Sequence, residues 1–126
     1  MAVHKKMQSK QKIFDELKKL ISRHAPLLVC VQDTVDACHL YTKYQMKNGQ
    51  PMYFGGIKIN KSFVSYYLMP IYVNPEMLKD IDANLKKHLK GKSCFNFKQL
   101  DDDVLTQLQE LTDKGLQDYH RQGYLV

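Results

Sequence analysis

The chain has 126 residues, of which 44% are hydrophobic and 25% are charged, and its formal net charge is +6. This composition is typical of an ordinary globular domain and unlike that of disordered, fibrous or membrane-spanning chains. The longest aliphatic run, residues 27–31, is far shorter than the roughly 20 residues that cross a bilayer, so we expect no membrane partner. The positive charge favours weak, non-specific binding to polyanions.

Residues 1–11 form a basic head that we predict to be flexible, and residues 12–126 are predicted to form one domain. The head is not followed by an apolar segment with a cleavage site, so we expect no secretory signal and a cytoplasmic location. The three cysteines, Cys30, Cys38 and Cys94, are odd in number and are expected to be reduced thiols.

The first element is a helix predicted over residues 11–24, where apolar residues recur every three or four positions. Pro26 ends it. Four strands are predicted next, over residues 27–33, 38–44, 51–59 and 62–69, with an Asn48-Gly49 turn between the second and the third. Because their connections are too short for crossovers, we expect these strands to pair antiparallel in chain order.

A second helix is predicted to start at Asn74-Pro75-Glu76 and to end at Gly91, with Leu78, Ile81, Leu85 and Leu89 on its buried face. A short strand, residues 93–97, and a helix opened by residues 101–103 complete the chain. The predicted fold is therefore α+β in the order α-β-β-β-β-α-β-α, with an antiparallel sheet of about five strands packed against helices.

No motif in the chain specifies catalysis or a cofactor. Gly91-Lys92-Ser93 lacks the earlier glycine, and it has neither the preceding strand nor the following helix of a phosphate-binding loop. A two-residue turn at Thr34-Val35 would set Cys30 opposite His39, but these two side chains are too few for a zinc site. The acids at 101–103 are better explained as a helix start than as a metal site. We therefore predict no catalytic residue and no metal ligand.

Tyrosines are concentrated in the predicted strands, together with lysines. Such residues can stack on the bases of single-stranded nucleic acid, pack against helices, line a pocket or form a dimer interface. Gly55 and Gly56 within a strand indicate a bulge or a close approach of backbone or ligand. The sequence leaves the oligomeric state open, a dimer included.

Residues 54–70, FGGIKINKSFVSYYLMP, followed by a helix and then by GKSCFNF at 91–97, resemble the YdhG-like family. The resemblance covers roughly residues 12–122. It implies a helix-flanked antiparallel sheet that is compared with frataxin. The family is a domain family of unknown function, and most of its members are small bacterial proteins. A few members are described as frataxin-like iron carriers. The first helix offers Asp15 and Glu16 among lysines, which departs from the acidic surface of an iron carrier.

The function predicted on these grounds is a non-enzymatic binding module for a small ligand or a protein partner. Its site is expected in the hollow between the sheet and the helices, and it is formed by Tyr53, Gly55, Gly56, Tyr66, Lys92, Ser93 and Cys94. The alternative is a frataxin-like intracellular iron carrier that uses residues 101–103 with Glu76 or Asp80. A third hypothesis is an enzyme with Cys94 as its nucleophile.

Overall fold

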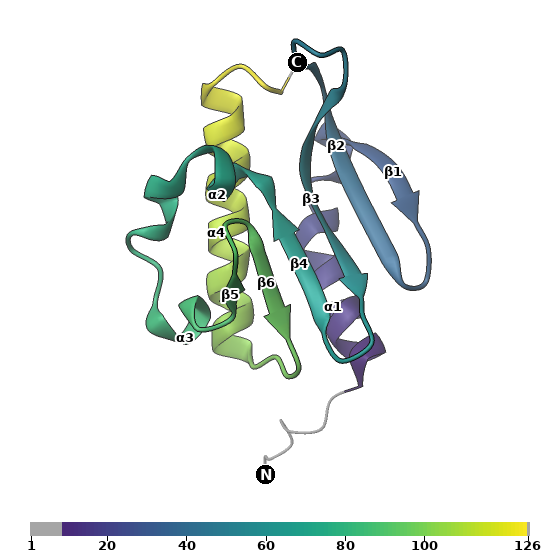
Figure 1. Ribbon diagram of the computed structural model, residues 1–126, viewed down its shortest axis with the longest axis vertical. Coiled ribbons are helices and arrows are strands. Elements are labelled where there is room, and N and C mark those ends of the chain that lie inside the picture. The colour runs from purple at the N-terminus through teal and green to yellow at the C-terminus, as the bar shows by residue number, and fades with distance from the viewer. Residues whose placement is uncertain (1–8, 126) are drawn as a thin grey trace.

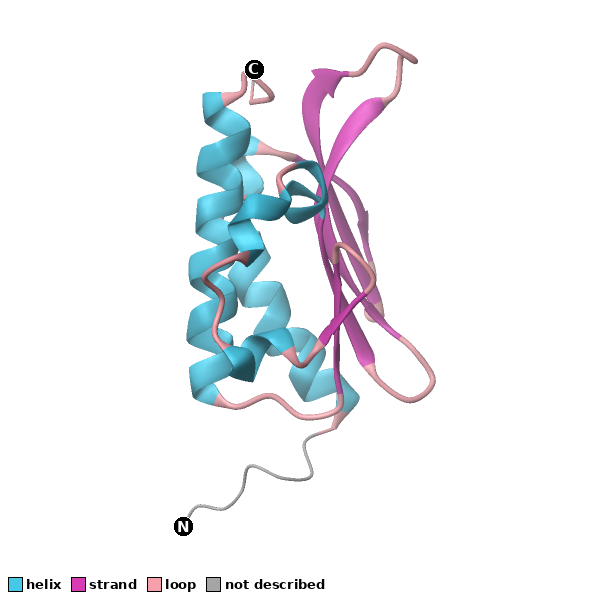
Figure 2. Ribbon diagram, turned by 60° about the vertical axis from the view of Figure 1, so that its left-hand side comes forward, coloured by secondary structure: helices cyan, strands magenta, loops and turns pink. Residues whose placement is uncertain are grey.

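A six-stranded antiparallel sheet forms one layer of the protein, and the long helices lie together on one of its faces (Figures 1 and 2). The computed structural model describes residues 9–125. The elements are, in chain order, α1 (Lys10–Ser22), η2 (Ala25–Leu27), β1 (Val29–Asp33), β2 (Ala37–Gln45), β3 (Pro51–Ile59), β4 (Val64–Leu68), α2 (Met69–Val73), η3 (Pro75–Leu78), α3 (Ala83–Lys86), β5 (Leu89–Lys90), β6 (Cys94–Phe97) and α4 (Asp102–Arg121). This is the predicted α+β class, with six strands in place of about five.

The strands lie in the order β1-β2-β3-β4-β6-β5. The first four pair antiparallel in chain order, as predicted. The turn between β2 and β3 has Gly49 at φ 82°, which confirms the expected turn chemistry. The last pair adds to the free side of β4, because β6 pairs with β4 and β5 pairs with β6.

The core lies between the sheet and the two long helices. Ile13, Leu17 and Ile21 of α1 are fully buried, as predicted from their spacing, and α1 packs on β3 and β4. Leu108 of α4 and Phe54 of β3 are also fully buried. Ser9 caps α1 by accepting a hydrogen bond from the Lys12 amide, and Asp101 caps α4 by accepting one from the Val104 amide at 2.8 Å.

The single helix predicted after Asn74 is wrong. The chain there forms the short η3 and α3, joined by an irregular segment that includes Ile81. Asp82 explains the interruption, since its side chain accepts from the Asn84 amide and starts a new helix at that point. Gly91 has the predicted positive φ of 70°, but it lies in the turn between β5 and β6, where it caps no helix.

The predicted head needs correction at its end. Residues 1–8 lie outside the described residues, whereas Lys10 and Gln11 already belong to α1. The Lys10 ammonium donates to the carbonyl oxygens of Asn60 and Lys61, which ties the start of α1 to the β3–β4 turn.

The predicted pairing of Cys30 with His39 is also wrong. Cys30 lies opposite Leu40, and Gln32 lies opposite His39. The turn lies one residue later than expected, because Asp33 pairs with Cys38, and this moves the pairing by two residues. The bulge at Val31 takes back one of these two residues, which leaves Cys30 opposite Leu40.

No helix within residues 9–125 has both the length and the apolar character that a membrane span requires.

Candidate functional site

One face of the sheet is turned away from α1 and α4, and we call it the outer face (Figure 2). Successive residues of a strand point to opposite faces, so the buried Leu40, Ile57 and Tyr66 fix which residues point outward. Their neighbours on the outer face form a row across four strands. In register, this row is His39, Gly56, Tyr67 and Cys94.

Four half-buried rings gather on this face, and we call them the aromatic cluster: His39, Tyr41, Tyr53 and Tyr67. The Tyr41 and Tyr53 rings meet edge to face with centroids 4.9 Å apart. The His39 ring lies 5.8 Å from that of Tyr53 and 6.2 Å from that of Tyr67. Such tilted and edge-on contacts are the favoured geometries of aromatic pairs.

Gly56 provides the space under the aromatic cluster. The His39 Nδ1 atom and the Tyr53 hydroxyl are hydrogen bonded at 2.7 Å directly above it. A Cβ atom at Gly56 would lie 2.3 Å from His39 Nδ1 and 2.5 Å from both the Tyr53 hydroxyl and the Cys38 carbonyl oxygen. The predicted close approach at this glycine is therefore made by side chains of the same sheet.

Two members of the aromatic cluster, His39 and Tyr53, are held in their neutral forms. Burial, followed by the charge of Lys58, lowers the pKa of His39. Burial raises the pKa of Tyr53 well above its usual range. At neutral pH His39 and Tyr53 are thus uncharged, while the exposed Lys58 lies beside them.

A chain of polar side chains borders the aromatic cluster. Asn60 Nδ2 donates to Ser65 Oγ, and Ser65 Oγ donates to Asn96 Oδ1, each at 2.8 Å. Cys94 Sγ also donates to Asn96 Oδ1, at 3.3 Å. Burial raises the pKa of the Cys94 thiol, which therefore stays protonated at neutral pH.

The structure divides the seven predicted ligand-binding residues among three places. Tyr53, Gly56 and Cys94 belong to the outer face. Gly55 and Tyr66 point to the helices. A Cβ atom at Gly55 would meet Ile21 of α1, and Tyr66 is fully buried with its hydroxyl 2.7 Å from Thr112 Oγ1.

Lys92 and Ser93 lie in the turn before β6, where the Ser93 carbonyl accepts from the Leu68 amide. Lys92 also lines a separate groove of about 590 Å³ with apolar side chains of α2, among them Ile71, Tyr72 and Val73. The space between sheet and helices, where the sequence placed the site, is filled by the core.

The sequence analysis missed His39, Tyr41 and Tyr67 as members of one site. Strand parity could have separated Tyr67 from Tyr66, because Val64, Tyr66 and Leu68 are the inward set of β4. Tyr41 and Tyr53 come to the same face through a register shift after Leu40, directly beside Gly55, where the paired glycines indicate a bulge.

Two acids of the iron-carrier hypothesis, Asp101 and Asp103, are engaged in local structure. Asp101 caps α4, and Asp103 accepts from Asn84 and Gln107 at 2.7 and 2.8 Å. Glu76 and Asp80 line a groove of about 420 Å³ between η3 and α4. Within residues 9–125, no three side chains of the types that bind metals gather in one place.

The chain matches no family model, no curated protein and no solved structure. The likeness to the YdhG-like family therefore stays a prediction from the sequence.

Proposed function

We propose that this protein is a non-enzymatic binding module whose ligand site is the outer face of the sheet. The aromatic cluster carries this proposal. Its four rings are only half-buried, and the helices leave this face of the sheet uncovered. Partly exposed tyrosines provide a rigid apolar contact surface with polar ends, and the Tyr53 hydroxyl is held in place by His39.

A small planar ligand with a negative charge fits this surface best. The neutral rings of His39 and Tyr53 and the neighbouring ring of Tyr67 offer faces and edges for stacking, and stacking on aromatic side chains does not depend on a particular base. Lys58 lies in register beside the cluster on β3 and supplies a positive charge for a phosphate or carboxylate. Nucleotides have this combination of ring and charge.

A non-enzymatic role is supported by the state of the thiol. Cys94 is the nucleophile that the third hypothesis requires, but its raised pKa and its hydrogen bond to Asn96 keep it in the unreactive protonated form. The iron-carrier alternative gains no support from Asp101 and Asp103, because both already accept hydrogen bonds from their own surroundings.

Isothermal titration calorimetry with three probes tests the proposal. Adenosine monophosphate has both ring and phosphate, adenosine has the ring alone, and ribose 5-phosphate has the charge alone. We expect the order of affinity to be adenosine monophosphate, then adenosine, then ribose 5-phosphate, because stacking contributes about 1–3 kcal/mol per base. Equal binding of the nucleotide and ribose 5-phosphate would mean that only charge is recognised, and it would contradict the proposal.

A pair of tyrosine variants locates the binding. Tyr67→Leu removes a ring of the aromatic cluster, so its affinity for adenosine monophosphate is expected to fall about fivefold or more, which corresponds to about 1 kcal/mol. Tyr72→Leu is the matched control, since Tyr72 is an exposed tyrosine on α2, away from the outer face. Its affinity should not change.

A further inference from the structure

Two of the three cysteines lie on neighbouring strands and on the same face of the sheet. Cys30 of β1 pairs with Leu40 of β2, and Asp33 of β1 pairs with Cys38 of β2. Leu40 and Cys38 are both buried in the core. Because residues paired across two strands point to the same side, Cys30 and Asp33 also point to the face that the helices cover. Cys30 and Cys38 are therefore diagonal neighbours on this face.

The thiol groups of Cys30 and Cys38 are close enough to interact. Burial raises the pKa of the Cys38 thiol, and the Cys30 thiol adds to this shift through its charge and a side-chain hydrogen bond. Diagonal neighbours have Cα atoms about 7–8 Å apart, whereas a disulfide usually joins Cα atoms about 4.4–6.8 Å apart. A disulfide therefore requires a small movement of β1. This strand is free to move, because it pairs only with β2 and all five of its residues are exposed.

The two thiols differ in their access to solvent. Cys30 is exposed, whereas only 2% of Cys38 is exposed. The raised pKa of Cys38 keeps its thiol protonated at neutral pH, and a protonated thiol reacts poorly with oxidants. Cys30 is therefore the thiol that meets an oxidant first, and Cys38 is the second thiol behind it. An accessible cysteine beside a second, resolving cysteine is typical of a redox-sensitive site.

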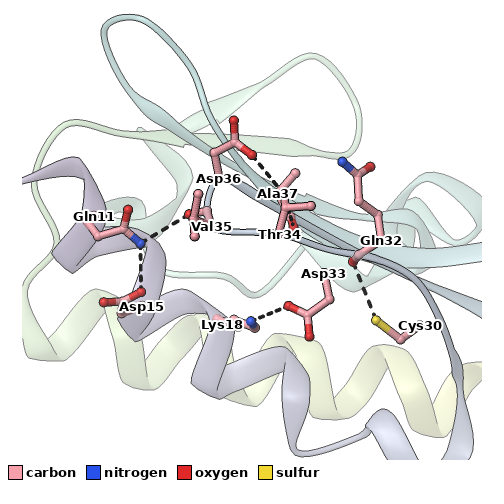
Figure 3. Close-up of polar contacts among 10 residues, drawn as sticks. All are labelled: Gln11, Asp15, Lys18, Cys30, Gln32, Asp33, Thr34, Val35, Asp36 and Ala37. Atoms are coloured by element: carbon pink, nitrogen blue, oxygen red, sulfur yellow. Dashed lines mark hydrogen bonds and ion pairs between the residues drawn. The ribbon is translucent and has the colours of Figure 1, made fainter.

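A lysine of α1 supplies positive charge to this pair of thiols. The Lys18 ammonium forms an ion pair with Asp33 of β1, the strand that also carries Cys30 (Figure 3). The pKa of Lys18 is raised first by its hydrogen bond to Asp33, and the thiols of Cys38 and Cys30 also raise it. This attraction is mutual, so the lysine stabilises a thiolate that forms beside it. The thiolate is the form of cysteine that attacks an oxidant.

We propose that Cys30 and Cys38 form a reversible disulfide when the protein meets a hydroperoxide, with Lys18 stabilising the attacking thiolate. The Cys30 thiolate attacks one oxygen of the hydroperoxide, the O–O bond breaks, and the other oxygen leaves as an alcohol, or as water from hydrogen peroxide, with the proton that Cys30 released. Cys30 is then a sulfenic acid. The Cys38 sulfur attacks the Cys30 sulfur, the S–O bond breaks, and the oxygen leaves as water with the Cys38 proton. The two sulfur atoms lose two electrons, and the hydroperoxide gains them.

A count of free thiols on the full chain tests the proposal, with hydrogen peroxide as the probe. After one equivalent of peroxide per chain, we expect the thiols that react with a chromogenic reagent in denaturant to fall from three to one. The chain mass should fall by two hydrogen atoms, and dithiothreitol should restore all three thiols. Peptide mapping should find Cys30 joined to Cys38 of the same chain. Three remaining thiols, or a disulfide that includes Cys94 or joins two chains, would overturn the proposal.

Three single variants separate the two chemical steps. Cys38→Ala should stop at the sulfenic acid of Cys30, which dimedone traps as an adduct, because the second thiol is missing. Cys30→Ser should give neither the adduct nor the disulfide. Cys94→Ser is the matched control and should form the disulfide as fast as the wild type, since Cys94 lies on β6, away from β1. A dimedone adduct at Cys94 in place of Cys30 would overturn the assignment, and the wild-type peptide map decides the pairing if a variant fails to fold.

Variants of the ion pair test the role of Lys18. In Lys18→Gln, the rate at which iodoacetamide alkylates Cys30 should fall about threefold or more, because the positive charge beside the thiolate is lost. Asp33→Asn breaks the same ion pair but keeps the lysine, so its rate should not fall. Lys19→Gln removes an exposed lysine that faces Glu16, and it should react as the wild type does. Equal slowing in Lys18→Gln and Asp33→Asn would trace the effect to the position of β1 and overturn the role of the lysine.

Discussion

Gly56 shows how a single residue shapes the outer face. The His39 ring and the Tyr53 hydroxyl occupy the space that a side chain at this position would need. Gly91 differs from Gly56. Its positive φ of 70° favours glycine, whereas an added Cβ atom would have no neighbour within 4 Å. The two glycines are therefore needed for different physical reasons, one for space and the other for backbone conformation.

This difference predicts unequal costs of substitution. Gly56→Ala should lower the free energy of unfolding by about 3 kcal/mol, since the Cys38 carbonyl oxygen is part of the backbone and moves only with its strand. Gly91→Ala should lower it by about 1 kcal/mol, the cost of a left-handed conformation with a Cβ atom. Urea denaturation measures both values. A Gly56→Ala protein as stable as the wild type would contradict the described packing of His39 and Tyr53.

His39 is expected to report the environment of the site through its titration. Its pKa is lowered first by burial and then by Lys58, so it should titrate below 6.5 in an NMR measurement of the ring protons. Lys58→Gln should raise this pKa towards 6.5. Because the unfolded chain binds this proton more readily, the contribution of His39 to stability is complete above pH 6.5 and is lost as pH falls through the lowered pKa. A His39 pKa above 6.5 would contradict this account.

At the scale of elements, the segment between α2 and β5 does not form the helix that its local sequence pattern predicts. Its sequence has the apolar spacing of one helix, but only Leu85 of the four predicted positions is fully buried. Leu78, Ile81 and Leu89 are partly buried at the margin of the core. A continuous helix would need Asp80 and Asp82 in its interior, where short acidic side chains compete with the helical hydrogen bonds.

The interrupted segment predicts that equal truncations have unequal effects. Leu85→Ala should lower the free energy of unfolding by about 2–5 kcal/mol, as is usual for a fully buried leucine. Ile81→Ala should cost less, because Ile81 lines the groove between η3 and α4 and is already partly hydrated. Thermal or urea denaturation of the two variants compares them directly. An equal loss at both positions would favour the continuous helix.

The elements with clear periodicity and end signals were predictable from sequence. The predicted bounds of β3 agree with the structure, and α4 begins at the predicted acids. The two-residue β5 was not predictable, since it exists only through its pairing with β6. Of the seven predicted ligand-binding residues, Tyr53, Gly56 and Cys94 lie on the outer face, whereas the space between sheet and helices where the sequence placed them is filled by the core. Parity depends on register, and the register shifts at Val31 and after Leu40. Gly55 and Gly56 indicate the second shift, whereas no local residue indicates the first.

On the scale of the whole molecule, the helices cover one face of the sheet and leave the other uncovered (Figure 2). An antiparallel sheet tolerates this arrangement because its residues alternate between core and solvent. The outer face differs from a simple solvated surface, on which polar side chains are usual. It carries the half-buried rings of His39, Tyr53 and Tyr67. This departure is the reason for placing the function there.

Mapping of adenosine monophosphate binding by amide chemical shifts in ¹⁵N-labelled protein tests this central claim most directly. The account predicts that the shifts are largest on β2, β3 and β4, at and beside His39, Gly56 and Tyr67, and that the amides of α4 do not move. Shifts confined instead to the groove of Tyr72 and Lys92, or spread over exposed lysines without a maximum on the outer face, would contradict it.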